Sequence, residues 1–182
     1  KGKKVAGPKG TILHQILVAA LNKEGLKPDA VNFVSLGIPA SVNALMSGEA
    51  DAALVAGADV LRAQKAGARV LCNGEGLVDA TIVIGVSGKL LKEHPDVVKK
   101  YLAIHQQNID FMNKEQEKAF GFTAKETGLT LDEVKIMAQW YDFSTKITEK
   151  DIKDLEETQD FLLLMGMQKN KIDIKSLLAE VK

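Results

Sequence analysis

The sequence is poor in cysteine and in aromatic residues. Its 182 residues include one cysteine, Cys72, and 5% aromatic side chains. A single thiol forms no internal disulfide and lacks the partners of a Cys-x-x-Cys or Cys/His zinc site. Because Cys72 follows the apolar Val70 and Leu71, we expect a buried structural thiol rather than a reactive one. We therefore expect neither a metal site nor a cofactor.

The sequence also lacks an excess of either charge and lacks long apolar runs. The 24 basic and 24 acidic residues balance, so no field of one sign favours nucleic acid or an acidic membrane as a partner. No apolar run reaches membrane-spanning length, and no charged segment followed by an apolar one resembles a signal peptide. The chain begins at Lys1 without methionine, which we interpret as a sign that it is a fragment.

Glycine is concentrated in the first half, where residues 1–91 hold 12 of the 15 glycines. There, short apolar segments of strand length alternate with segments of helical periodicity that end at Gly25, Gly48 and Gly67. This order is typical of a mostly parallel sheet covered by helices on both faces. The expected strands are residues 4–7, 31–36, 51–56, 70–72 and 81–87, the last being apolar enough for burial on both faces.

The second half is richer in charge and is expected to be helical. Pro95 suits the first turn of one helix, and a second helix over residues 114–127 stops at Gly128. Thr130 and Glu133 have the spacing of a capping box. A last helix is expected over residues 148–165. The sequence thus predicts an α/β lobe over residues 1–88 followed by a helical segment over residues 89–182.

Catalytic patterns are not evident. The histidines are His14, His94 and His105, and each is better explained as a structural or surface residue than as a base or metal ligand. No HExxH, GxSxG, phosphate-binding loop or dinucleotide-binding pattern is present. The acidic pairs lie in charged helical stretches, where a solvated face is the simpler interpretation. We expect no enzyme activity.

The strongest functional pattern lies where the first expected strand meets its helix, at Lys9, Gly10 and Thr11. Free backbone N–H groups at a helix N-terminus, a hydroxyl and an ammonium suit an oxyanion such as sulfonate, phosphate or carboxylate. The competing interpretation is that Thr11 only caps the helix and Gly10 only permits the turn.

Two further junctions are expected at the same edge of the sheet. They contain Pro39 and Ser41 after the second strand, and Gly57 and Asp59 after the third. In open α/β sheets, ligands bind outside the carboxyl ends of the strands. Three helix starts at one edge make binding about as plausible as capping alone.

The ordered motifs resemble the sulfonate, taurine and nitrate type of ABC-transporter substrate-binding protein. They are GKKVAGPKGT at residues 2–11, GIPAS at 37–41, ALMSGEADA at 44–52, KAGARVL at 65–71 and KLLKEHPDVVK at 89–99. The resemblance implies a type II periplasmic-binding-protein fold of two lobes. It further implies that this chain lacks an N-terminal lobe, toward which the later helices would normally pack, so we expect self-association of the chain.

The resemblance also assigns roles to individual residues. Lys9, Gly10 and Thr11 match the anion-facing helix start, and Pro39 to Ser41 match a Pro-Ala-Asp junction, although Ser41 lacks the acid. Gly57 and Asp59 stand where related sulfonate binders often carry tryptophan or Pro-Phe, which favours a small aliphatic sulfonate over an aromatic one.

The resulting hypothesis is the solute-binding component of an ABC importer. It would bind a small anion in an interlobe cleft, deliver it to membrane permease subunits, and reside outside the cytoplasm, in the periplasm or as a membrane-anchored lipoprotein. One alternative is an enzyme like those of thiamine-pyrimidine synthesis, which rely on a cysteine cluster and a reactive histidine. Another is the ligand-sensing domain of a signalling protein.

Overall fold

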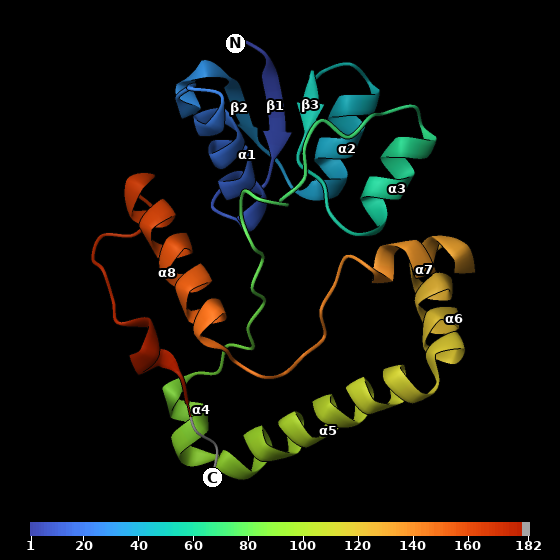
Figure 1. Ribbon diagram of the computed structural model, residues 1–182, viewed down its shortest axis with the longest axis vertical. Helices are drawn as coiled ribbons and strands as arrows, with labels where there is room; N and C mark the ends of the chain where they lie inside the picture. Colours follow the sequence, from blue (N-terminus) through green and yellow to red (C-terminus); the bar gives the residue numbers. More distant parts are fainter. Residues whose placement is uncertain (180–182) are drawn as a thin grey trace. The chain divides into compact units, whose positions relative to one another are not determined.

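A three-stranded parallel sheet organises the first part of the chain. The computed structural model describes residues 1–179, and its strands are β1 (Lys4–Gly7), β2 (Asn32–Ser35) and β3 (Ala52–Ala53). Their order is β2-β1-β3, with β1 in the centre (Figure 1). Both pairings are parallel, which confirms the predicted sheet type. β3 is shorter than the predicted strand over residues 51–56.

Asp51 fixes the register of β3 against β1. Its backbone N–H donates to the carbonyl of Lys4 at 2.9 Å, and its carboxylate accepts from the Lys4 N–H at 2.8 Å. The same carboxylate pairs with the Lys3 ammonium at 2.9 Å. The hydrogen bond from Lys3 is the main cause that lowers the pKa of Asp51. These contacts lie where the two strands begin. They therefore fix the strand register at the amino end of the sheet, opposite its carboxyl edge.

Helices cover both faces of the sheet. On one face, the central Ala6 is 1% exposed and packs with Ala44 of α2 (Ile38–Met46) and with Ala50. Val5 points to the other face together with its register partner Phe33, because residues alternate along a strand. That face is covered by α1 (Ile12–Lys23), whose His14 stacks on Phe33. The small side chains on the Ala6 face allow α2 to lie close to the sheet.

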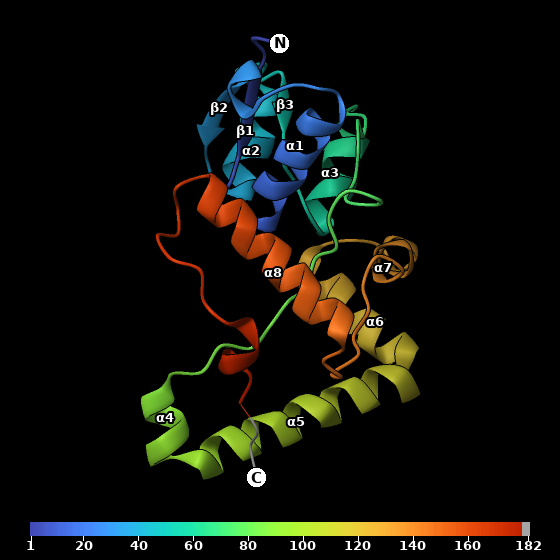
Figure 2. The same ribbon diagram turned by 60° about the vertical axis from the view of Figure 1, so that its left-hand side comes forward.

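Two shorter helices and one later helix complete this unit. The 3-10 helix η1 (Pro28–Ala30) precedes β2, and α3 (Ala58–Lys65) follows β3. The compact unit contains residues 1–81 and also residues 149–172, because α8 (Glu149–Leu164) lies against α1 (Figures 1 and 2). In this contact Thr158 donates to the Gln15 side chain at 3.1 Å, and Phe161 meets His14 edge to face.

The second compact unit contains residues 82–148 and the segment from residue 173. Its described elements are helical: α4 (Gly88–Glu93), α5 (Pro95–Lys114), α6 (Gln116–Thr127), α7 (Leu131–Ala138) and the 3-10 helix η2 (Ile174–Leu177). Thr130 and Glu133 form the predicted capping box at the start of α7, and Gly128 ends α6 with φ 69°. The predicted boundary between residues 88 and 89 stays a prediction; the compact units divide the chain at other positions.

Predictions for two segments, residues 70–72 and 81–87, are wrong. Residues 70–72 and 81–87 form no strand, and Ile82, Val83 and Ile84 are 85%, 60% and 50% exposed instead of buried. Cys72, in the first of these segments, is exposed as well. The reason is common to both segments: apolar, β-branched sequence favours a strand only when a neighbouring strand completes its hydrogen-bond ladder.

Among the described helices, none combines the length and apolar character needed to cross a membrane.

Gly7 should be sensitive to a single added methyl group. A Cβ at Gly7 would lie 2.6 Å from the Cβ, Cγ and Cδ1 atoms of Leu54, so Gly7→Ala must separate the end of β1 from the chain after β3. We expect a loss of about 1–3 kcal/mol in the free energy of unfolding, measured by urea denaturation. The control is Gly121→Ala in α6, where a Cβ meets open space and the higher helix propensity of alanine should be neutral or stabilising. Equal midpoints for the two variants would contradict the prediction.

Candidate functional site

Three helix N-termini lie at the carboxyl edge of the sheet. Each of β1, β2 and β3 leads into a helix, α1, α2 and α3 respectively, and the strands are parallel. Helices that follow parallel strands all begin at the same edge, as Figure 1 shows for this sheet. The structure therefore brings the three predicted junctions to one edge. All of them lie within the first compact unit.

The first junction is a tight loop over residues 8–11. Gly10 has φ 75°, in the left-handed region that favours glycine. Thr11 occupies the N-cap position in an extended conformation, but it makes no side-chain cap; its hydroxyl instead donates to the carbonyl of Pro8 at 2.9 Å. The backbone N–H groups of the first turn of α1 have no acceptor within the helix. The Thr11 hydroxyl thus orders the loop and does not cap the backbone N–H groups of the first turn.

His14 holds this loop from inside the unit. Its Nδ1 accepts a hydrogen bond from the Gly10 N–H at 3.3 Å. The ring is 3% exposed, stacked on Phe33 at 4.4 Å between centroids and met edge to face by Phe161 at 5.4 Å. Burial, and then the nearby charge of Lys9, lower the pKa of His14 from its ordinary value. Both effects favour the neutral imidazole, and an Nδ1 that accepts from Gly10 leaves the proton of that form to Nε2.

From the sequence alone, His14 is predicted to be an ordinary helical histidine, and its hydrogen bond with Gly10 is not foreseen. The available signal was the spacing of four residues between Gly10 and His14, which places an imidazole one turn into the helix that the glycine loop enters. The sequence also gives no sign that the segment after α8 lies near this loop. Met167 lies over Gly10 closely enough that a Cβ on Gly10 would be 3.1 Å from its sulfur.

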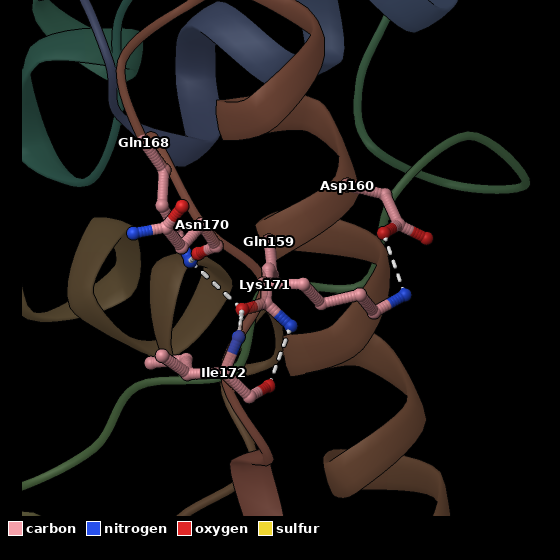
Figure 3. Close-up of polar contacts among 6 residues, drawn as sticks. All are labelled: Gln159, Asp160, Gln168, Asn170, Lys171 and Ile172. Carbon is pink, nitrogen blue, oxygen red and sulfur yellow. Dashed lines mark hydrogen bonds and ion pairs between the residues drawn. The ribbon is translucent and has the colours of Figure 1, made fainter.

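The segment that carries Met167 is fastened by Gln159 of α8 (Figure 3). The Gln159 side-chain amide is 3% exposed and donates to the Ile172 carbonyl at 3.0 Å, while its oxygen accepts from the Ile172 N–H at 2.7 Å and from Gln168 at 2.8 Å. Lys171 adds an ion pair with Asp160 at 2.9 Å. One amide thus satisfies both backbone polar groups of Ile172, as a neighbouring strand would.

The second junction offers backbone groups only. Pro39 has no N–H to donate. Ser41 is fully buried, and its hydroxyl donates to the carbonyl of Gly37 at 3.0 Å. This side chain is directed at its own helix start, so the structure does not bring its hydroxyl to the other predicted site residues. The donors left at the start of α2 are the N–H groups of Ile38 and Ala40.

The third junction carries a paired carboxylate. Gly57 has φ 59° and precedes α3. Asp59, in the first turn, accepts from the Arg62 guanidinium at 2.9 Å. A carboxylate in this position is stabilised by the helix dipole. Because Arg62 offsets its charge, Asp59 opposes an anion at this edge less than an isolated carboxylate would.

Together these features place hydrogen-bond donors and one basic side chain at a single edge of the sheet. Its donors are backbone N–H groups and the exposed ammonium of Lys9, and its wall includes Gly10 and Met167. Within residues 1–179 no group of three His, Cys, Asp or Glu side chains has the geometry of a metal site. The fold is periplasmic-binding-protein-like, and solved structures with this fold match almost the whole chain.

Two of the matching structures are sulfonate-binding proteins. The periplasmic aliphatic sulphonate binding protein SsuA from Escherichia coli superposes with a TM-score of 0.76 at 22% identity, over 99% of this chain and 59% of that protein. The alkanesulfonate-binding protein SsuA from Xanthomonas axonopodis pv. citri, bound to MOPS, gives 0.80 at 20% identity over 97% and 62%. These likenesses confirm the predicted α/β, periplasmic-binding-protein-like fold.

The chain belongs to the NMT1/THI5-like family, whose family model matches residues 1–119. Relatives from Brucella abortus and Brucella suis, named only as binding proteins, are 28% identical over 133 residues. The match covers 69% of this chain and 41% of those relatives. The chain thus spans less than half the length of these relatives and about 60% of the two SsuA structures.

Acid should destabilise the first unit through His14. Its pKa in the folded chain is lower than the ordinary 6.5, so between those two values the unfolded chain binds more protons than the folded one. The free energy of unfolding should fall as the pH drops below about 6.5. The contribution of His14 to this fall should end once the pH is below the pKa of His14 in the folded chain. Urea denaturation from pH 8 to pH 5 measures it. His14→Phe should remove this component of the slope, and an identical pH dependence in both chains would contradict it.

Gln159 should be important for stability although it is polar. Gln159→Leu removes three hydrogen bonds from a buried position, and we expect a loss of about 2 kcal/mol in the free energy of unfolding. Gln159→Glu keeps the shape and the accepting oxygen but loses the donor to Ile172, so it should also destabilise. Gln64→Leu on the exposed surface of α3 is the control and should change stability by less than about 0.5 kcal/mol. A Gln159→Leu variant as stable as the control would show that the hydrogen bonds of Gln159 to Ile172 and Gln168 are dispensable.

Proposed function

We propose that this chain contributes the ligand-binding edge of a solute-binding protein that takes a small organic sulfonate or a similar oxyanion. The observation that carries the proposal is the meeting of three helix N-termini at one sheet edge, with Lys9 beside the first of them. Backbone N–H groups and the positive end of a helix dipole stabilise an anion without a counter-charge. Both structural relatives are sulfonate-binding proteins, which supports the same ligand class.

In this proposal Lys9, Gly10 and Thr11 form the main anion contact. Lys9 supplies charge, Gly10 supplies the turn, and the amides that follow Gly10 supply hydrogen bonds. Pro39 and Ser41 shape the second junction, with Ser41 holding its backbone from inside. Gly57 and Asp59 line the wall at the third junction, where the pair with Arg62 keeps the carboxylate compensated. The small residues there favour an aliphatic sulfonate, taurine or nitrate over an aromatic sulfonate.

The wider role follows from the family and remains part of the proposal. The protein would act outside the cytoplasm, in the periplasm or tethered by a lipid anchor, and deliver its ligand to the permease subunits of an ABC importer. A binding role is favoured over an enzymatic one because the relatives are named as binding proteins. The sequence offers a single cysteine, and His14 is engaged in the loop rather than open to a substrate.

The N–H of Ile12 provides a sharp test of this site. Ile12 is the first residue of α1, where proline is well tolerated, and Thr11 before it is already extended, as a residue before proline must be. Ile12→Pro therefore deletes one donor and preserves the helix. Isothermal titration calorimetry with methanesulfonate, taurine and nitrate should show roughly tenfold weaker binding, as expected for a lost hydrogen bond to a charged group.

The matched control is Ile12→Ala, which shortens the same side chain but keeps the N–H and should bind nearly as the parent does. Lys9→Gln should weaken binding by roughly threefold and reduce its dependence on salt, because the ammonium is exposed and screened. Parent protein that releases no heat with any of these anions would sink the proposal, and so would Ile12→Pro and Ile12→Ala binding alike.

A further inference from the structure

We infer that His14 is a positioning residue for the proposed anion site: by accepting the Gly10 N–H, its Nδ1 fixes the loop from which the first-turn donors of α1 project. The inference rests on the proposed function for its ligand, but the contact itself belongs to the fold. None of the sequence motifs assigns this role to His14.

The ring can fill this role because its orientation is fixed. Phe33 of β2 stacks on one side at an interplanar angle of 19°, and Phe161 of α8 meets it at 84°. With 3% of the residue exposed, water has little access to compete for Nδ1. An aromatic ring held on two sides keeps its lone pair aimed at Gly10, whereas a flexible exposed side chain would not.

Gly10 is the residue that most needs such a partner. Its φ of 75° is readily reached by glycine but is one of several basins open to it. The hydrogen bond to His14 holds its N–H, and the Met167 sulfur lies where a side chain at this position would have to go. Because the Gly10 N–H is committed to His14, the ligand must be met by the amides that follow it, and their direction depends on the loop.

The hydrogen bond requires a neutral imidazole. Protonation would place an N–H on Nδ1, facing the N–H of Gly10, and two donors repel each other. Among the described residues packed around the ring, Lys9 is the charged group that acts on it, and it also disfavours a second positive charge. Phe33, Phe161 and the neighbouring Gln15 do not titrate near neutral pH. Protonation of His14 should therefore release the loop.

The decisive variants are His14→Asn and His14→Gln. The Asn side chain places an acceptor oxygen near the position of Nδ1, while the Gln side chain reaches the position of Nε2 and offers Gly10 no partner. Calorimetric titration with methanesulfonate at pH 8 should give affinity within about twofold of the parent for His14→Asn. For His14→Gln it should be roughly three- to tenfold weaker, at a melting temperature matched to that of the Asn variant.

A second measurement does not depend on the ligand. In ¹H–¹⁵N spectra, the imidazole nitrogens of the parent should report the Nε2–H form, and the Gly10 amide should titrate together with His14 as the pH is lowered. In His14→Gln the Gly10 amide should lose this titration and exchange faster with solvent. A proton on Nδ1 at pH 8, or a Gly10 amide that ignores both pH and substitution, overturns the inference.

The two measurements separate the two ideas. If the parent binds none of the anions while the Gly10 amide follows His14, the proposed function fails and the control of the loop by His14 stands. If the parent binds methanesulfonate and the Asn and Gln variants bind it equally, the proposed function stands and the inference fails.

Discussion

The parallel pairing of β1 with both of its neighbours is the constraint on which the rest of the first unit depends. It sends every following helix back to the same edge, so three sets of unpaired N–H groups meet where the strands end. The pairing in turn depends on close packing, since Ala6, Ala44 and Ala50 leave little distance between β1 and α2. Asp51 secures the other end of the strands through Lys3 and Lys4. Register, packing and the position of the candidate site are therefore one arrangement.

This arrangement is completed by a distant part of the chain. α8 begins at residue 149, yet it packs on α1, and its Phe161 closes the space around His14. Gln159 then folds the following segment back, which sets Met167 against Gly10. The loop that carries the proposed site is thus supported by residues more than 140 positions away in the sequence. A change in the stability of the α8 segment should alter the loop, because Phe161 of α8 packs on the His14 ring that holds Gly10.

The sequence predicts well what is decided locally. The glycine stops and the capping box of Thr130 depend on neighbours within a few residues, and the structure confirms them. The strands over residues 4–7 and 31–36 are confirmed as well, because each finds a partner in the sheet. Residues 70–72 and 81–87 have equally strong strand composition, but a strand also requires a partner, which composition cannot supply. The same limit applies to Cys72 and Ser41, whose exposure and orientation depend on which faces become covered. The role inferred for His14 depends on Phe33 and Phe161 both meeting its ring, and no periodicity encodes those contacts.

The character of the edge bears on how it would choose among anions. The one basic side chain in the first loop, Lys9, is exposed and therefore screened by salt, and the acidic Asp59 is balanced by Arg62. Formal charge thus contributes little to the difference between one small anion and another. Backbone N–H groups contribute more, since their directions are fixed by the helices and the loops. At the proposed site a ligand would then be distinguished by the number and geometry of its oxygens. Selectivity would depend on the precision of the Gly10 turn, and hence on the hydrogen bond from Gly10 to His14.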